Sequence, residues 1–266
     1  MTSALLLLAV VLLVVLIFEY INGFHDTANA IATVVSTKVL TPRQALLLAS
    51  TTNLIGAFFG QAVAKTIHSG IIDDKVVAVT TLTILCAMLG AIIWNLLTWW
   101  FGMPSSSSHA LIGGLIGAAM ASAPGHWNWH VLIWSRHKMD SKTGLPTADM
   151  EGIFHKVIIP MVSSPVLGFT IGFIFMGFLF FLIRNWRPKT VNSVFGKLQI
   201  VSAGYMGLGH GMADAQKTMG IMMLTLFAST KAGDLDQLPG WLHFLRVPDK
   251  SASIPLWIMI TCAVTM

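Results

Sequence analysis

Long apolar runs constrain this chain more than any other feature. Crossing the ~30 Å hydrocarbon core of a bilayer takes about 20 consecutive apolar residues. Candidate spans lie at 3–35, 43–65, 76–101, 157–183 and 198–229. Only 10% of the 266 residues are charged and 55% are hydrophobic, whereas a soluble domain has about 25% charged residues. The sequence therefore predicts an all-α polytopic membrane protein, and it excludes a soluble domain and a disordered chain.

The first and last of these spans are unusually long, and polar residues and glycines interrupt each near its middle. The interruptions are Glu19, Asn22, Gly23, His25, Asp26 and Asn29 in one span, and Gly209 to Lys217 in the other. We therefore predict two broken helices. If a short helix at 105–123 crosses the membrane once, five crossings precede the last broken helix, so it runs opposite to the first. This is the pattern of an inverted-repeat secondary transporter.

The same reasoning divides the chain into three parts. Residues 1–183 form the first membrane repeat, 184–197 form a basic inter-repeat loop, and 198–266 begin a second, incomplete repeat. We expect an integral membrane protein in contact with the lipid bilayer and with no nucleic-acid partner, because the basic residues are scattered between apolar spans.

Four ionisable residues lie within apolar spans, namely Glu19, Asp26, Asp214 and Lys217. An ionised group at the centre of a membrane helix costs at least ~2.5 kcal/mol. For Glu19 we favour a position at the membrane interface. We interpret Asp26 and Asp214, with the amide oxygens of Asn22 and Asn29, as a coupling-ion site for a proton or a hard cation. The structural alternative is that Asp214 and Lys217 neutralise one another at i, i+3.

The second informative element is the turn formed by Pro104, the four serines Ser105, Ser106, Ser107 and Ser108, and His109. Proline and serine favour a helix start, where backbone N–H groups attract anions. The turn is therefore a candidate site for a tetrahedral oxyanion, phosphate or sulfate; its alternative is a polar helix cap. An anion beside carboxylates needs accompanying cations, which predicts symport.

Two other classes of function are alternatives. His210 and Asp214, at i, i+4 on one helical face, suggest an intramembrane metalloenzyme, with His25, Asp26 and His109 as possible further ligands. The chain has no His-Glu-x-x-His arrangement to supply a general base, so we predict no enzyme, no catalytic residue, no resident metal site and no cofactor. The remaining alternative is a membrane partner that does not transport.

Three motifs carry a resemblance to a known family. INGFHDTANAIATVVST at 21–37, FGMPSSSSHALIGGLIG at 101–117 and GHGMADAQKTMGI at 209–221 resemble the inorganic phosphate transporter (PiT) family, most closely its bacterial low-affinity members. The resemblance implies a carrier of the bacterial inner membrane. Such a carrier moves phosphate with protons or sodium, and the substrate in bacterial members is a neutral metal–phosphate complex.

By the same resemblance, Asp26, Asn29 and Asp214 lie at the coupling-ion site, and Ser105 to Ser108 hold phosphate. Gln216 and Lys217 belong to the polar face of the last motif and are assigned to the phosphate site. One departure is Ala213, where the family usually has an asparagine before its aspartate; this removes one oxygen ligand for sodium.

Length is the other departure. The offset of 188 that superposes Asp26 on Asp214 places a second serine turn near residue 292, beyond Met266. We favour a piece of a longer reading frame. The alternatives are a truncated product and a homo-oligomer that completes its site with another copy.

Overall fold

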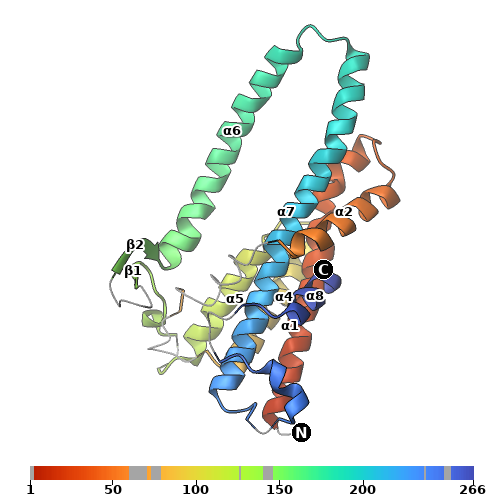
Figure 1. The fold of residues 1–266 in the computed structure, drawn as a ribbon. Coiled ribbons are helices and arrows are strands. Elements are labelled where there is room, and N and C mark those ends of the chain that lie inside the picture. Colours follow the sequence, from red (N-terminus) through yellow and green to blue (C-terminus); the bar gives the residue numbers. More distant parts are fainter. Residues whose placement is uncertain are drawn as a thin grey trace.

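The computed structural model describes residues 3–59, 71–72, 79–125, 127–139, 146–236, 238–248 and 253–266. Helices make up most of this part of the chain (Figure 1). Three of its helical segments are long and apolar enough to cross a membrane: Ser3–Ser36, Thr81–Trp100 and Phe154–Ile183. The predicted all-α polytopic class is confirmed.

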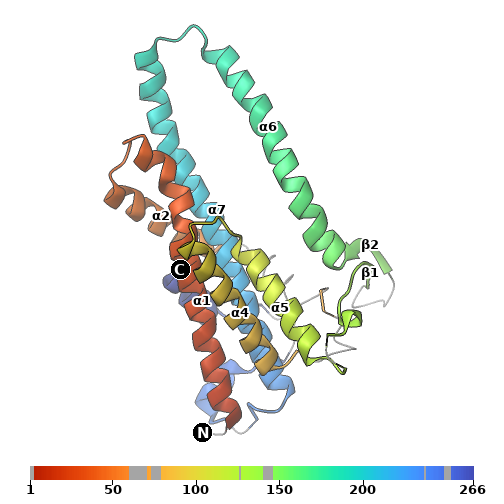
Figure 2. The same cartoon turned by 180° about the vertical axis from the view of Figure 1, so that it is seen from behind.

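Helices α1 (Ser3–Ser36) and α7 (Pro188–Lys231) lie side by side and run in opposite directions (Figures 1 and 2). Contacts along their length fix this direction. Thr37, just after α1, donates a hydrogen bond to Gln199 near the start of α7, and Thr218 in the second half of α7 donates to Glu19. The antiparallel arrangement agrees with the predicted opposite direction of the two spans.

Both helices are continuous, so the predicted breaks are wrong. α1 runs without interruption through Asn22 to Asn29, and α7 runs through Gly209 to Lys217. The physical reason is that polar side chains do not by themselves break a helix, and neither region contains a proline. The polar residues instead face neighbouring helices. α7 also begins at Pro188, so residues 188–197 of the predicted basic loop are helical.

Helix α2 (Pro42–Ala57) packs closely against α7 through glycines. A Cβ atom on Gly56 would lie 2.3 Å from the Leu208 carbonyl oxygen, and one on Gly211 would lie 2.1 Å from that of Asn53. The two backbones approach so closely that only glycine fits at these positions. α2 is the described part of the span predicted at 43–65.

Helices α4 (Thr81–Trp100) and α5 (Ser107–Ser122) form a pair on another side of α1 (Figure 2). They correspond to the span predicted at 76–101 and the short helix predicted at 105–123. The main core lies between α1, α4, α7 and α8 (Leu256–Thr265), and Phe18, Met88, Met219 and Ile258 are among its fully buried side chains. This packing determines the rotation of each helix about its axis, and therefore the direction in which its polar residues face.

Helix α6 (Ile159–Ile183) stands apart from the other helices and joins α7 through a short turn (Figure 1). It follows a π-helical turn, η2 (Phe154–Ile158), and matches the predicted span at 157–183. None of its side chains is buried, although it is rich in phenylalanine and leucine. Such a surface suits contact with lipid tails.

The segment between α5 and α6 contains structure that the sequence analysis missed. Strands β1 (Arg136–Met139) and β2 (Pro146–Glu151) pair in an antiparallel ribbon, with an ion pair of 2.5 Å between Arg136 and Glu151. Short helical turns, η1 (Trp129–Val131) and η3 (Gly240–Leu245), lie in connecting segments. These elements lie away from the polar faces of α1 and α7.

Candidate functional site

A cavity of about 370 Å³ lies where α1, the start of α5 and the middle of α7 meet. The residues lining it are Asp26, Asn29 and Ala30 from α1, Ser106, Ser107 and Ser108 at the start of α5, and Met206, His210, Asp214 and Lys217 from α7. We call this cavity the pocket. It brings together residues of the three sequence motifs at 21–37, 101–117 and 209–221, which lie far apart along the chain.

The α1 side of the pocket carries a carboxylate with two neighbours. Asp26 Oδ1 lies 2.8 Å from His25 Nδ1, and Ser107 donates a hydrogen bond of 3.4 Å to Asp26 Oδ2. Asp26 thus connects the first motif to the serine turn. Asn29, three residues further along α1, adds an amide group that can donate to an anion or accept from a cation.

The serine turn forms the start of α5. Ser106 is the N-cap residue, and its hydroxyl accepts a hydrogen bond of 3.4 Å from the His109 backbone N–H. The first N–H groups of a helix have no carbonyl partner within it, and the helix dipole adds partial positive charge there. The pocket therefore has anion-attracting groups on this side that carry no formal charge.

The α7 side is a row of three interacting side chains. His210 Nδ1 lies 2.8 Å from Asp214 Oδ2, and Lys217 donates a hydrogen bond to Asp214 Oδ1. The Asp214 side chain is only 4% exposed, so both partners stabilise a charge that is nearly removed from water. The Asp214–Lys217 pairing was the structural alternative in the sequence analysis, and the structure contains it.

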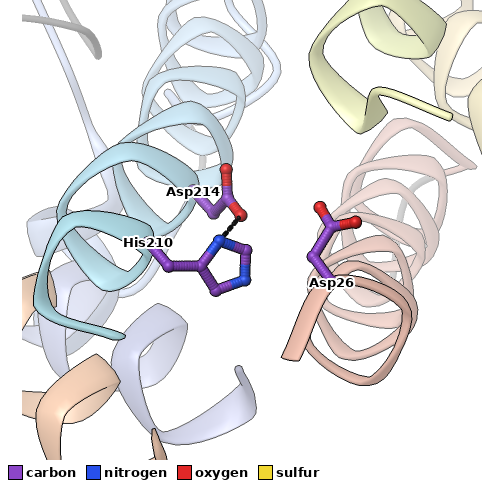
Figure 3. Close-up of side chains that lie close together, drawn as sticks. All are labelled: Asp26, His210 and Asp214. Atoms are coloured by element: carbon purple, nitrogen blue, oxygen red, sulfur yellow. Dashed lines mark ion pairs between the residues drawn. The ribbon is translucent and has the colours of Figure 1, made fainter. Parts of the chain in front are cut away.

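Asp26 faces this row across the pocket (Figure 3). The ligand atoms of Asp26, His210 and Asp214 all lie within 4.8 Å of one another. Two carboxylates and an imidazole at this separation suit a divalent cation or a shared proton. His210 Nε2 is buried and has no hydrogen-bond partner among the described residues, so this ring nitrogen is available to a ligand.

Most of the predicted site residues meet in the pocket. Asp26, Asn29, Asp214, Lys217, Ser106, Ser107 and Ser108 all line it. Ser105 does not: its hydroxyl accepts a hydrogen bond of 3.0 Å from Trp94 Nε1. Gln216 also lies outside, because α7 turns it away from the pocket, where it donates to the Phe59 carbonyl at 3.0 Å.

Asn22 is separated from the other predicted coupling-ion residues. It is fully buried and does not line the pocket. Glu19, expected at the membrane interface, is likewise fully buried, and this expectation is wrong. The physical reason is that Glu19 faces α7, where the Thr218 hydroxyl donates a hydrogen bond to its carboxylate. The site also includes His210, which was not among the residues predicted for the phosphate site or the coupling-ion site. Its i, i+4 spacing from Asp214 was the available signal.

Comparison with known proteins identifies the family. Residues 22–266 match the Phosphate transporter family. The chain is 45% identical over 207 residues to a probable low-affinity inorganic phosphate transporter of Streptomyces halstedii, covering 77% of this chain and 86% of that protein. It is 38% identical over 244 residues to a protein of the same description from Bacillus subtilis, covering 92% and 67%.

A third relative, a probable low-affinity inorganic phosphate transporter of Mycobacterium tuberculosis, is 37% identical over 266 residues; all of this chain aligns with 55% of that protein. Among solved structures, a sodium-dependent phosphate transporter superposes with a TM-score of 0.73 at 20% identity, covering 97% of this chain and 73% of that one. This last likeness shows a shared fold.

The chain belongs to the phosphate transporter family. The resemblance in the three motifs is confirmed, and phosphate is the substrate of the family. Its members are transporters rather than enzymes, so the metalloenzyme hypothesis is set aside. The family and the apolar helices together indicate an integral membrane protein.

Proposed function

We propose that this chain transports inorganic phosphate across a membrane in symport with a cation, a proton or a sodium ion, and that the pocket binds both. One observation carries the proposal. The pocket joins a helix N-terminus rich in hydroxyls to two carboxylates on antiparallel helices. Anion-binding and cation-binding groups thus share one cavity.

Phosphate binding is assigned to the α5 side and Lys217. Ser106, Ser107 and Ser108 offer hydroxyl donors, and the N–H groups at the start of α5 add neutral donors. Lys217 lines the same cavity. Asp214 partly neutralises the positive charge of Lys217, so Lys217 attracts phosphate without holding it too tightly for release.

The coupling between the cation and phosphate follows from the negative charge of Asp26 on the α1 side of the pocket. Asp26 bonds to Ser107, one of the serines assigned to phosphate, so an ionised Asp26 repels a bound anion at short range. A proton or cation on Asp26 removes this repulsion. Phosphate therefore binds best when the cation is already bound, which is the thermodynamic condition for symport.

A divalent metal carried with the phosphate is a second form of the same proposal. Asp26, His210 and Asp214 have the donor set and spacing for a metal ion, and a metal–phosphate complex would place its positive part near these groups. In this form the metal is cargo that leaves with the phosphate, while the serines hold the phosphate oxygens.

The pocket should bind phosphate in preference to sulfate, because the Asp26 carboxylate can accept a hydrogen bond from the substrate. Hydrogen phosphate carries a hydroxyl that can donate to a carboxylate, whereas sulfate has no proton to donate at neutral pH. Asn29, on the same helix turn, can accept such a bond as well.

Reconstituted vesicles test the proposal. Purified chain is placed in liposomes, and accumulation of radiolabelled phosphate is measured under a pH gradient, a sodium gradient or neither, with and without Mg²⁺. We expect accumulation above equilibrium under at least one gradient, with sulfate competing weakly. Phosphate that only equilibrates would contradict symport, and a lack of any uptake would favour the non-transporting membrane partner.

A further inference from the structure

A second group of polar side chains lies beside the pocket but outside it. We call it the inner layer: Glu19 and Asn22 on α1, Asn95 on α4 and Thr218 on α7. Each of these residues is at most 1% exposed. The proposed function uses none of them.

The register of the helices places these residues at one level. α1 and α4 run in the same direction: Ala4 and Thr81 line one cavity near their starts, and the rings of Phe24 and Trp99 lie 5.6 Å apart near the other end. Asn95 precedes Trp99 by four residues, so it lies beside the turn of α1 that precedes Phe24. That turn holds Glu19 and Asn22.

Thr218 adds the third helix to the same level. Its hydroxyl donates a hydrogen bond to Glu19 Oε2. Thr218 is four residues after Asp214 on α7, and Glu19 is seven residues before Asp26 on α1. The inner layer is therefore about 6–10 Å along the helices from the pocket carboxylates.

Several atoms of this layer lack partners. Glu19 Oε1 and both side-chain polar atoms of Asn22 and of Asn95 are buried with no hydrogen bond among the described residues. Buried polar atoms are nearly always hydrogen-bonded, because leaving one unsatisfied costs about 1–3 kcal/mol. Three of these five atoms are oxygens, Glu19 Oε1 and the amide oxygens of Asn22 and Asn95, so the layer offers buried oxygen ligands that no described residue satisfies.

We propose that the inner layer is a second, enclosed site for a monovalent cation, a proton or Na⁺, held by Glu19 with the amide oxygens of Asn22 and Asn95. A carboxylate with two amide oxygens is a hard oxygen donor set for Na⁺; for a proton, Glu19 carries it and an amide oxygen accepts the resulting hydrogen bond. Its role in transport rests on the proposed function; its cation binding does not.

Electrostatic interactions link Glu19 of the inner layer to the charged residues of the pocket. Titratable groups facing Glu19 are Asp214, Lys217 and His210 on α7 and Cys262 on α8. Asn95 on α4 contributes no charge. The cation on Glu19 and the charges around Asp214 therefore act on one another, which lets occupancy of the inner layer alter phosphate binding without touching phosphate.

The test separates exchange of phosphate from its accumulation. Vesicles containing wild type, Glu19→Gln or Thr225→Val are assayed for exchange of labelled phosphate without a gradient and for accumulation under one. Thr225 is the control for the loss of a buried polar group. It is buried on α7, as Thr218 is, and its hydroxyl donates to the Ile221 carbonyl of α7 itself. We expect Glu19→Gln to keep exchange and to lose accumulation by about 5- to 150-fold, the usual size of coupling between sites.

Two further measurements distinguish the cations. If the occupant is Na⁺, NaCl raises the melting temperature of purified wild type above that in choline chloride, and Glu19→Gln abolishes the difference. If it is a proton, the infrared spectrum shows a pH-dependent protonated carboxyl band that Glu19→Gln removes. Thr218→Val, which keeps Glu19 and removes its donor, should shift either response without abolishing it.

The inference is overturned if Glu19→Gln accumulates phosphate as wild type does, or if wild type shows neither cation response. A wild type that moves no phosphate refutes the proposed function. In that case the melting and infrared measurements still decide whether the inner layer binds a cation, because neither requires transport.

Discussion

The pocket and the inner layer lie one to two helical turns apart along α1 and α7, yet they differ in cavity volume and in the pairing of their polar groups. The pocket has a cavity of about 370 Å³, and its main carboxylates are paired with histidine or lysine. The inner layer is enclosed, and most of its polar atoms have no partner among the described residues. The pocket therefore has space for an oxyanion, whereas the inner layer offers buried oxygen atoms that no described residue satisfies.

This contrast indicates how one pair of helices can carry separate sites for phosphate and for a cation. Groups that touch the substrate need access and paired charges, because unpaired charges would bind it too tightly or repel it. A site for a coupling ion has to be enclosed, because the ion then enters or leaves only when the protein changes conformation. If this division is correct, variants of the pocket groups that contact phosphate impair exchange itself, whereas inner-layer variants impair only the coupling of phosphate to the cation.

The largest effect is expected for Asp26→Asn. The substitution keeps the shape but removes the charge that His25 and Ser107 contact. Asparagine cannot take up the coupling proton or bind the cation as a carboxylate does, so coupled accumulation should fall about 100-fold, the upper range of coupling between sites. Exchange should fall less, because a neutral side chain does not repel the anion. Uptake in vesicles measures both. Asp149→Asn, on the exposed ribbon, is the control for expression and insertion; preserved accumulation in Asp26→Asn would remove this residue from the mechanism.

The serine turn should give the next largest effect. Replacing Ser106, Ser107 and Ser108 by alanine removes hydroxyls that line the pocket, and each hydrogen bond to a charged group contributes about 1.5–3 kcal/mol. Phosphate affinity should fall by about tenfold or more per contacting serine, as measured by equilibrium binding. Ser105→Ala is the matched control, since that hydroxyl bonds to Trp94 outside the pocket. Equal losses in both variants would leave the turn as a helix cap only.

A smaller effect is expected for His210→Gln, which tests the metal. Removing one of three ligands should lower Mn²⁺ affinity by about 10- to 100-fold, measured calorimetrically, and should reduce the stimulation of phosphate uptake by Mn²⁺. Chelation with EDTA should remove that stimulation from wild type. Glu19→Gln should lower Mn²⁺ affinity much less than His210→Gln does, because Glu19 is not one of the three ligands. His243→Gln, in η3, is the control; unaltered Mn²⁺ binding in His210→Gln would contradict the metal–phosphate form.

The smallest effect on phosphate is expected for Gly211→Ala. The added methyl group meets the Asn53 carbonyl of α2 at 2.1 Å, whereas Gly209→Ala, two residues away, meets nothing within 4 Å. Overpacking costs about 1–3 kcal/mol, so Gly211→Ala should lower the melting temperature and Gly209→Ala should not. Any loss of uptake in Gly211→Ala should affect exchange and accumulation equally, since α2 supports α7 as a whole. A loss confined to accumulation would link this contact to coupling instead.

Much of the pocket was predictable from local sequence. Asp26, Asn29, Ser106 to Ser108, Asp214 and Lys217 are polar residues in apolar surroundings, and the free-energy cost of placing such groups in a membrane is by itself a sign of function. Helix propensity was less informative about shape. Polar residues and glycines suggested broken helices, but α1 and α7 are continuous, because their backbone hydrogen bonds do not depend on side-chain polarity.

The membrane class, the family and the residues that supply the chemistry were all predictable from the amino-acid sequence, because they depend on composition and on motifs along the chain. The tertiary structure decided which of those residues share a cavity. It excluded Ser105 and Gln216 from the pocket and grouped Glu19 with Asn22, Asn95 and Thr218. The physical reason is that the rotation and register of packed helices arise from contacts between distant segments, such as the glycine contacts of α2 with α7, and no local pattern contains them.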